Sequence, residues 1–226
     1  MTAKGIDKKK VLIVHGGRLF AEHGFDRVTT RMIAENAGVS VSSIHYHFAS
    51  KEELYVAAFE YAHDKDNRVD FLDVLAENPD LAMTPAGKAE IIKSTVMRYF
   101  RNIFNPKRPT WETQLLVREI LNPSSALPAL AKSFIHSNVY SSEKFCEMIR
   151  PDMDKDERTI WADTLFSHLF LYALTRKQIE AVRGGDWLNE DFYYKASRMI
   201  ARFMILELDL PLPAELKKEH REKWVR

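Results

Sequence analysis

The stretch between residues 40 and 51 is the part of the chain whose side chains most clearly suit a chemical task. Ser42 and Ser43 offer hydroxyl groups and His45 offers an imidazole. Tyr46 adds a phenol and Lys51 an ammonium group. Hydroxyl, imidazole, phenol and ammonium groups can all form hydrogen bonds with the polar groups of nucleic acid. The combination therefore suits contact with double-stranded nucleic acid.

The residues around this stretch predict two short helices joined by a tight turn. Thr30 can cap the first helix, which has an apolar stripe at positions 33, 34 and 37. Gly38 can adopt the left-handed conformation that the turn requires, and Ser40 can cap the second helix. Ile44 and Phe48 are four residues apart and face the core, so the polar residues between them project outward. This is the plan of a helix-turn-helix, whose second helix enters the major groove of DNA.

Two further helices are expected on either side of this motif. Apolar residues at positions 12, 19 and 20 share one face of a helix over residues 8–23, which Gly24 should end. Ser50 and Glu53 have the spacing of a capping box at the start of a fourth helix. Lys51 falls in the first turn of that helix, where a cation opposes the helix dipole. We therefore expect a phosphate near Lys51.

The segment from about residue 20 to residue 54 resembles the DNA-binding domain of the TetR family. The matching positions are Phe20, Gly24, Phe25, Thr29 or Thr30, Ile33, Ala34, Ala37, Gly38, Val39, Ser40, Phe48, Lys51, Glu52 and Leu54. The resemblance implies that Thr30, Tyr46 and Lys51 contact phosphates. It also implies that the bases face Val41, Ser42, Ser43 and His45. The complete set of predicted DNA-binding residues is Thr30, Arg31, Val41, Ser42, Ser43, His45, Tyr46 and Lys51.

Some positions depart from the family pattern. Val41 stands where Lys or Arg is usual, Ser42 replaces a Gly, and His45 replaces a Tyr. In the first helix, His15 and Gly16 stand where alanines are common. The departures leave the predicted fold intact. They leave the base contacts and the operator sequence open, since a Val can touch a thymine methyl and a Ser can serve several bases.

The chain as a whole is predicted to be all-α. We expect a three-helix helix-turn-helix domain over residues 1–55, a larger helical ligand-binding and dimerisation domain over 56–213, and a charged tail over 214–226. The residue before a proline disfavours the helical conformation, so the X-Pro steps indicate helix ends. These steps begin at residues 78, 84, 105, 108, 122, 127 and 150.

The last two strong helices are predicted near residues 155–182 and 190–208. The first is apolar around nearly its whole circumference, which calls for burial on two sides. A partner subunit would supply the second side, as TetR-like proteins pair two such helices from each subunit. Burial inside one large monomer core is the alternative. The predicted dimerisation residues are Leu165, Leu169, Tyr172, Phe192, Met199, Ile200 and Phe203.

The same C-terminal part is expected to bind a small effector. The candidate ligand-binding residues are Tyr99, Phe104, Trp111, Arg118, Phe134, His136, Trp161, His168 and Tyr172. Each of them could instead be an ordinary core residue or a satisfied polar group. An aromatic lining suits an apolar or aromatic molecule. The segment over residues 118–130 also resembles the C-terminal domain of a CecR-like subgroup of the TetR family.

Composition and motifs argue against other classes of function. The formal net charge is +1 and the only cysteine is Cys146, which fits a reducing, cytoplasmic setting without an intrachain disulfide. No signal peptide and no apolar segment long enough to span a membrane are apparent. Asp152, Asp154 and Asp156 alternate like a calcium loop but lack its glycine, so a helix start explains them better. No zinc, phosphate-loop or nucleophile pattern is present, so we expect neither a metal, nor a cofactor, nor an enzyme.

The function predicted from these observations is that of a homodimeric repressor that an effector releases from a palindromic operator. Two rival hypotheses stay open. A helical enzyme with this small domain would need convergent polar groups and a nucleophile or metal. A DNA-binding dimer without an inducer would have a filled C-terminal core. Whether the regulator represses or activates depends on where its operator lies relative to a promoter, which the chain does not record.

Overall fold

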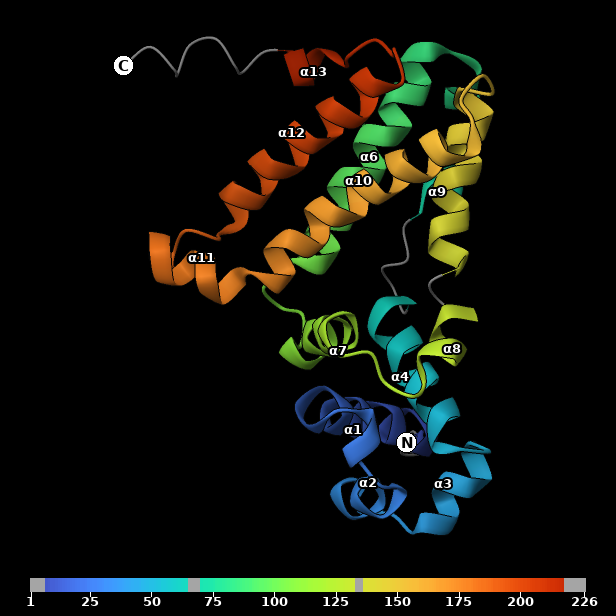
Figure 1. Cartoon of the computed structure of the whole chain (residues 1–226), viewed down its shortest axis with the longest axis vertical. Helices are drawn as coiled ribbons and strands as arrows, with labels where there is room; N and C mark the ends of the chain where they lie inside the picture. Colours follow the sequence, from blue (N-terminus) through green and yellow to red (C-terminus); the bar gives the residue numbers. More distant parts are fainter. Residues whose placement is uncertain (1–6, 65–69, 133–135, 218–226) are drawn as a thin grey trace, which may run out of the picture. The chain divides into compact units, whose positions relative to one another are not determined.

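The computed structural model describes residues 7–64, 70–132 and 136–217, with the side chains of 63–64 and 136–139 left out. Every regular element in these ranges is a helix, as Figure 1 shows, so the predicted all-α class is confirmed. The chain forms two compact units. Unit 1 spans residues 1–68 and 108–137, and unit 2 spans residues 69–107 and 138–226. None of the described helices is both long and apolar enough to cross a membrane.

Unit 1 begins with the predicted motif. Its helices are α1 (Lys8–His23), the 3₁₀ turn η1 (Phe25–Arg27), α2 (Thr30–Ala37), α3 (Val41–His47) and α4 (Lys51–Asp64). Gly24 ends α1 at φ 85°, and Gly38 takes the left-handed conformation at φ 66°. The Ser40 hydroxyl accepts the Ser43 N–H at 3.3 Å, which confirms its predicted capping role. One detail differs: Thr29, not Thr30, caps α2 by accepting the Met32 N–H at 3.2 Å.

Two later helices complete the core of unit 1. They are α7 (Thr110–Leu121) and α8 (Leu127–Leu130). Trp111, Leu115 and Leu130 belong to the same buried cluster as Leu12 and Phe20 of α1. The compact unit therefore includes a segment that begins more than forty residues after the expected boundary at residue 55. The functional division at that boundary stays a prediction.

Unit 2 contains the remaining helices. They are α5 (Phe71–Glu77), the 3₁₀ turn η2 (Pro79–Met83), α6 (Pro85–Ile103), α9 (His136–Ile149), α10 (Lys155–Leu174), α11 (Arg176–Arg183), α12 (Glu190–Glu207) and α13 (Ala214–Lys217). Most prolines lie at or just outside helix ends, as expected from their steric effect on the preceding residue. The predicted helix over 155–182 is two helices, because Thr175 interrupts it.

Aromatic rings fill much of the core of unit 2. Phe71 stacks on Phe145 with ring centroids 4.7 Å apart, and Phe104 stacks on Tyr193 at 4.0 Å with nearly parallel planes. The Trp161 indole N–H donates to the Met204 carbonyl of α12 at 3.1 Å. The first contact joins α5 to α9, and the other two join α12 to the end of α6 and to α10.

The start of the predicted charged tail is part of unit 2. Leu216 is buried, and the Lys93 ammonium lies 2.6 Å from a Glu215 carboxylate oxygen. Arg198 and Arg202 of α12 donate to the carbonyl oxygens of residues 215 and 216. The expectation of a surface extension from residue 214 is therefore wrong for α13, whose one buried leucine gives it an anchor. Residues 218–226 lie outside the described part.

Candidate nucleic-acid interface

The outer face of α3 is the strongest candidate for contact with DNA. Ile44 and the following Phe48 are buried, while Val41 is exposed by 37% and Tyr46 by 84%. Ser42 and His45 are exposed as well. A seven-residue helix with one face in the core thus presents the others to solvent. The predicted outward projection of this polar face is confirmed.

The hydroxyl groups at the start of α3 bond to one another. The Ser40 hydroxyl lies 2.8 Å from that of Ser42 and 3.1 Å from that of Ser43. Ser43 is half-buried as a result of its place beside the cap. A base that accepts a hydrogen bond from Ser42 or Ser43 would replace these contacts, and hydroxyl groups can rotate to do so at little cost.

The start of α2 carries the other predicted contacts. Thr30 is half-buried in the first turn, and Arg31 is exposed. The Arg31 Nε lies 2.9 Å from a Glu35 oxygen one turn later, and this bond raises the pKa of Arg31. Exposed pairs of this kind contribute little to stability, so Arg31 could exchange Glu35 for a phosphate.

Lys51 has partners inside the protein. Its ammonium donates to the carbonyl oxygens of Phe25 and Val28, each at 3.0 Å, and lies 4.0 Å from the centroid of the Phe25 ring. These contacts satisfy backbone acceptors around η1 and explain a cation in the first turn of α4. The phosphate inferred from the helix dipole is therefore not needed to account for Lys51. A phosphate contact through its third N–H stays a prediction.

Arg118 of α7 holds the end of α1. Its Nε donates to the Ala21 carbonyl at 2.8 Å and its Nη2 to the Glu22 carbonyl at 2.6 Å. These carbonyls are among the last of α1 and have no partner within that helix. A Cβ on Gly24 would lie 3.4 Å from Arg118 Nη1, so the glycine leaves room for the guanidinium. We predicted Arg118 as a ligand-orienting residue, whereas the structure gives it this structural role.

Glu119 forms a buried hydrogen-bond network in unit 1. The Tyr55 hydroxyl donates to one carboxylate oxygen at 2.6 Å, and the Ser124 N–H and hydroxyl both approach the other at 3.1 Å. Burial, reinforced by the bond to Glu119, raises the pKa of Tyr55, so its hydroxyl stays protonated as the donor. Ser125 adds a bond to Asp26 at 2.7 Å. Sequence reasoning missed this network, because its members are up to 99 positions apart.

Trp111, another predicted ligand-binding residue, packs on α1. A Cβ built on Gly17 would lie 2.3 Å from Trp111 Cζ3, so only glycine fits at this position as the two helices stand. The indole also stacks on Tyr61 of α4 at a centroid distance of 6.4 Å. Trp111 thus serves the core of unit 1, and the Gly16–Gly17 pair in α1 has a packing explanation.

The other predicted ligand-binding residues divide between unit 2 and the undescribed part of the chain. Tyr99, Phe104 and Tyr172 pack against the buried cluster that contains Trp161. The His168 ring lies 2.6 Å from the Thr164 carbonyl of its own helix. Phe134 and the side chain of His136 lie outside the described residues. The aromatic cluster also contains Tyr193, which the sequence analysis did not select.

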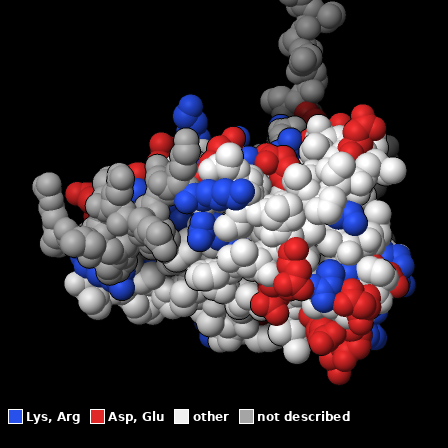
Figure 2. Space-filling view, turned by 90° about the horizontal axis from the view of Figure 1, so that it is seen from above, with Lys and Arg blue, Asp and Glu red and all other residues white. Residues whose placement is uncertain are grey.

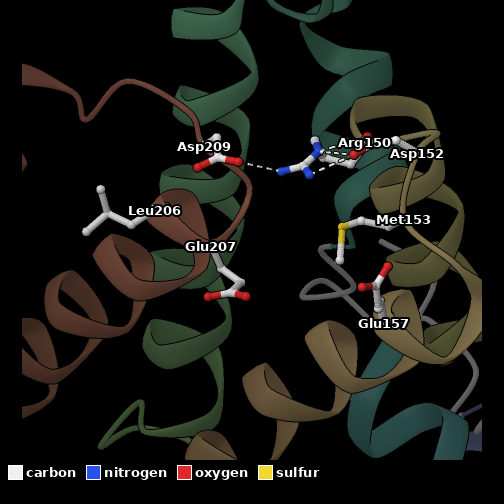
Figure 3. Close-up of a pocket in the computed structure, with 7 residues that line it drawn as sticks. All are labelled: Arg150, Asp152, Met153, Glu157, Leu206, Glu207 and Asp209. Carbon is white, nitrogen blue, oxygen red and sulfur yellow. Dashed lines mark hydrogen bonds and ion pairs between the residues drawn. The ribbon is translucent and has the colours of Figure 1, made fainter.

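A polar cleft of 420 Å³ lies in unit 2 between the end of α12 and the segment that joins α9 to α10 (Figure 3). Its lining residues are Arg150, Asp152, Met153, Glu157, Leu206, Glu207 and Asp209. Arg150 bonds to Asp152 at 2.8 Å and to Asp209 at 2.9 Å, so both carboxylates already have a cation. None of the predicted ligand-binding residues lines this cleft. Among the described residues, no group of three or more acidic, histidine or cysteine side chains could hold a metal ion.

The predicted dimerisation residues split into two groups. Leu165, Leu169 and Ile200 are buried within unit 2 and Tyr172 and Phe192 are half-buried, so the first three are corrected to core residues. Met199 and Phe203 are exposed by 44% and 56%. The exposed apolar face also includes Leu206 on α12 and Ile160 and Leu171 on α10. Periodicity located α10 and α12 as helices but could not separate their inward from their outward faces, since both faces are apolar, and their role in dimerisation stays a prediction.

Charge is mixed on the face of the molecule seen in Figure 2. Lysine and arginine side chains lie among aspartates and glutamates, with large uncharged areas between them. The formal net charge of the chain is only +1. A DNA contact therefore depends on the local arrangement of cations in unit 1 and not on an overall basic character.

Comparison with known proteins supports the helix-turn-helix assignment. Residues 12–58 match the family described as bacterial regulatory proteins, tetR family. The chain is 30% identical over 141 residues to the HTH-type transcriptional dual regulator CecR of Shigella flexneri. The aligned region covers 62% of this chain and 61% of the relative. The chain is also 26% identical over 115 residues to the HTH-type transcriptional repressor AcnR of Corynebacterium diphtheriae. That aligned region covers 50% of this chain and 50% of the relative. These matches span less than two thirds of either relative.

The fold extends the similarity to the rest of the chain. A transcriptional regulator from Rhodococcus sp. Rha1 superposes with a TM-score of 0.58 over 88% of this chain and 96% of that one, at 16% identity. At that identity the match concerns the fold alone. The motif residues and the family match therefore agree that residues 12–58 form a DNA-binding segment of the kind found in the tetR family of bacterial regulatory proteins.

Proposed function

We propose that this protein is a homodimeric transcriptional regulator that binds operator DNA through α3. The observation that supports this most strongly is the exposed face of α3, held on a buried core within a segment that matches the family. Val41, Ser42, Ser43 and His45 would contact base edges in the major groove. Thr30, Arg31, Tyr46 and Lys51 would contact phosphates that position the helix.

The dimer would form through the exposed apolar faces of α10 and α12. Met199, Phe203 and Leu206 follow helical spacing on α12 and leave a stripe of apolar surface uncovered in the single chain. A two-fold axis would pair this stripe and that of α10 with their copies in a four-helix arrangement. Two α3 helices about 34–36 Å apart would then match the two halves of a palindromic operator.

Unit 2 would also bind a small, largely apolar or aromatic effector. Its support is the cluster around Phe104, Tyr172 and Tyr193, where the Tyr193 hydroxyl is buried without a hydrogen-bond partner among the described residues. The proposed effector residues are thus Tyr99, Phe104, Trp161, His168 and Tyr172. An effector that binds the DNA-free conformation more tightly would release the protein from the operator, which would relieve repression by a bound repressor.

The names of the two relatives described above indicate different kinds of regulation, since one is a dual regulator and the other is a repressor. We favour repression with release by the effector, acting in the cytoplasm without a cofactor or a catalytic step. A helical enzyme is the weaker candidate, since the buried polar groups Tyr55 and Glu119 of unit 1 are engaged in structural hydrogen bonds. A regulator without an effector would differ by keeping its operator affinity in the presence of every compound tested.

A binding selection from random duplex DNA tests the proposal. The purified full-length protein should enrich a palindrome with two half-sites about one helical turn apart. Failure of a folded, dimeric protein to enrich any sequence at moderate salt would contradict the proposal.

Two sets of variants then test the residue assignments. Tyr46→Ala should weaken binding to operator and unrelated DNA alike, whereas Ser43→Ala and His45→Ala should change the preferred sequence. Lys51→Ala is a poor probe of phosphate contact, because it also removes two hydrogen bonds around η1. An equal loss on all sequences for the Ser43 and His45 variants would contradict their assignment to base contacts.

A further inference from the structure

Three consecutive lysines open the first helix of unit 1. Lys8, Lys9 and Lys10 are the first residues of α1 and are all exposed. The only nearby carboxylate of this helix, Asp7, accepts the backbone N–H groups of Lys9 and Lys10 and so serves as the helix cap. Within the described part of the chain, no hydrogen bond or ion pair is made by the three ammonium groups.

The stability of the fold does not account for these charges. The first turn of a helix is the positive end of its dipole, so lysines there are unfavourable, and neighbouring cations repel each other. Lys51 holds a similar position in α4 but donates to two carbonyl oxygens at 3.0 Å. The contrast indicates that the cations of α1 meet a partner outside the chain.

The placement of Lys9 points to the partner. Its ammonium lies 5.6 Å from the centroid of the Phe48 ring, and Phe48 is the residue that ends α3. Tyr46, two residues earlier, is the most exposed large residue of α3 at 84%. Lys9 therefore flanks the C-terminal end of the helix that is proposed to enter the major groove.

Lys10 points elsewhere. Its ammonium lies 6.0 Å from the centroid of the Tyr61 ring, in the last turn of α4. Tyr61 is ten residues beyond Lys51, or about 15 Å along the helix axis at 1.5 Å per residue. The ammonium groups of the two adjacent lysines thus lie near different helices of unit 1, Lys9 at the end of α3 and Lys10 at the end of α4. Lys10 is therefore a matched control for Lys9.

We propose that Lys9, with Lys8 beside it, binds a backbone phosphate of the DNA strand that passes the end of α3. The inference rests on the proposed function, since it concerns the same DNA. A duplex presents about one negative charge per 1.7 Å of its axis, so a groove filled by α3 has phosphates along both edges. The contact adds affinity without sequence preference, because phosphates are the same at every base pair.

The test compares Lys9→Gln, the double variant Lys8→Gln/Lys9→Gln and the control Lys10→Gln with the unaltered full-length protein. Affinity for the enriched operator and for an unrelated duplex is measured over a range of salt concentrations. Lys9→Gln should weaken both complexes about tenfold and reduce the slope of log K against log salt by about 0.9 per subunit. The melting temperature should stay the same or rise, since a charge leaves the positive end of α1.

Several results would overturn the inference while leaving the proposed function standing. An unchanged salt slope in Lys9→Gln would do so, as would an equal reduction in Lys10→Gln, which would indicate a general effect of charge. A fall in melting temperature that parallels the loss of affinity would assign Lys9 a structural role instead. If the unaltered protein binds neither duplex, the proposed function itself fails.

Discussion

Unit 1 and unit 2 differ in how the buried polar groups inside each unit are satisfied. In unit 1, Lys51 and Arg118 donate long-range hydrogen bonds to backbone carbonyl oxygens, and Glu119 accepts one from the Tyr55 hydroxyl. In unit 2, two stacked ring pairs, Phe71–Phe145 and Phe104–Tyr193, lie in or against the core, and the hydroxyl groups of Thr95 and Tyr193 are buried without a partner among the described residues. Unit 2 also exposes an apolar face on α10 and α12.

The difference indicates which contacts stabilise each unit. Directional hydrogen bonds define the position of α1 and α4 within narrow limits, because they weaken steeply with distance and angle. Stacked rings and uncovered apolar faces leave room for another molecule to contribute. We therefore expect changes in unit 1 to act on folding within one chain, and changes in unit 2 to act on association.

The largest effect should come from a charge on the exposed face of α12. Phe203→Glu would place an uncompensated carboxylate at the proposed dimer interface in both subunits, which should cost about 4 kcal/mol and weaken the dimer about a thousandfold. Sedimentation velocity over a concentration series measures the change. Met148→Glu, on an equally exposed methionine of α9, is the control. A dimer that survives Phe203→Glu would place the interface elsewhere.

Loss of the buried carboxylate in unit 1 should be the next largest effect. Glu119→Ala leaves the Tyr55 hydroxyl and the Ser124 donors without their acceptor and should reduce the free energy of unfolding by about 3 kcal/mol. Urea denaturation followed by circular dichroism gives the value. Glu52→Ala, on the exposed side of α4, should change it by less than about 0.5 kcal/mol. Equal values for the two variants would contradict the network.

The adjacent glycines of α1 test whether α7 belongs with unit 1. In Gly17→Ala the new methyl meets the Trp111 ring at 2.3 Å, so overpacking should outweigh the gain in helix propensity and destabilise the protein by about 1–2 kcal/mol. In Gly16→Ala the nearest atom is 3.4 Å away, and the protein should gain up to about 1 kcal/mol. The melting temperature, measured against that of the unaltered protein, should fall in Gly17→Ala and rise in Gly16→Ala. A stabilising Gly17→Ala would mean that Trp111 does not pack there.

The smallest effect concerns an unpaired hydroxyl of unit 2. Thr95→Val removes a fully buried group that has no hydrogen-bond partner among the described residues and should stabilise the protein by about 1 kcal/mol. Thr164→Val loses a bond to the Ile160 carbonyl and should change stability by less than about 0.5 kcal/mol. Chemical denaturation of both variants gives the comparison. Destabilisation by Thr95→Val would indicate a partner for the hydroxyl outside the described residues.

Local rules predicted the parts of the molecule that local interactions determine. The helix-turn-helix followed from Gly38, the Ser40 cap and the spacing of Ile44 and Phe48, all within eleven residues. Contacts that join distant segments left no comparable pattern. Nothing near Arg118 indicates that its guanidinium reaches Ala21, and the cation at Lys51 suggested a phosphate because the carbonyls of Phe25 and Val28 are remote in sequence.

Unit 2 was harder to predict because its helices are apolar on more than one face. Periodicity identified α10 and α12 but could not separate the buried Leu165 from the exposed Leu171. The break at Thr175 also had no proline or glycine to announce it. The effector residues remain a prediction, since an aromatic ring in a core and one in a ligand site look the same in sequence.

The return of the chain to unit 1 has a consequence for protein synthesis. The polypeptide enters unit 2 after residue 68 and comes back at residue 108, so Trp111, Leu115 and Leu130 emerge from the ribosome long after α1. At about 5–20 residues per second, the first helices wait several seconds for the side chains that complete their core. The core of unit 1 can therefore be completed only after more than half of the chain has been made.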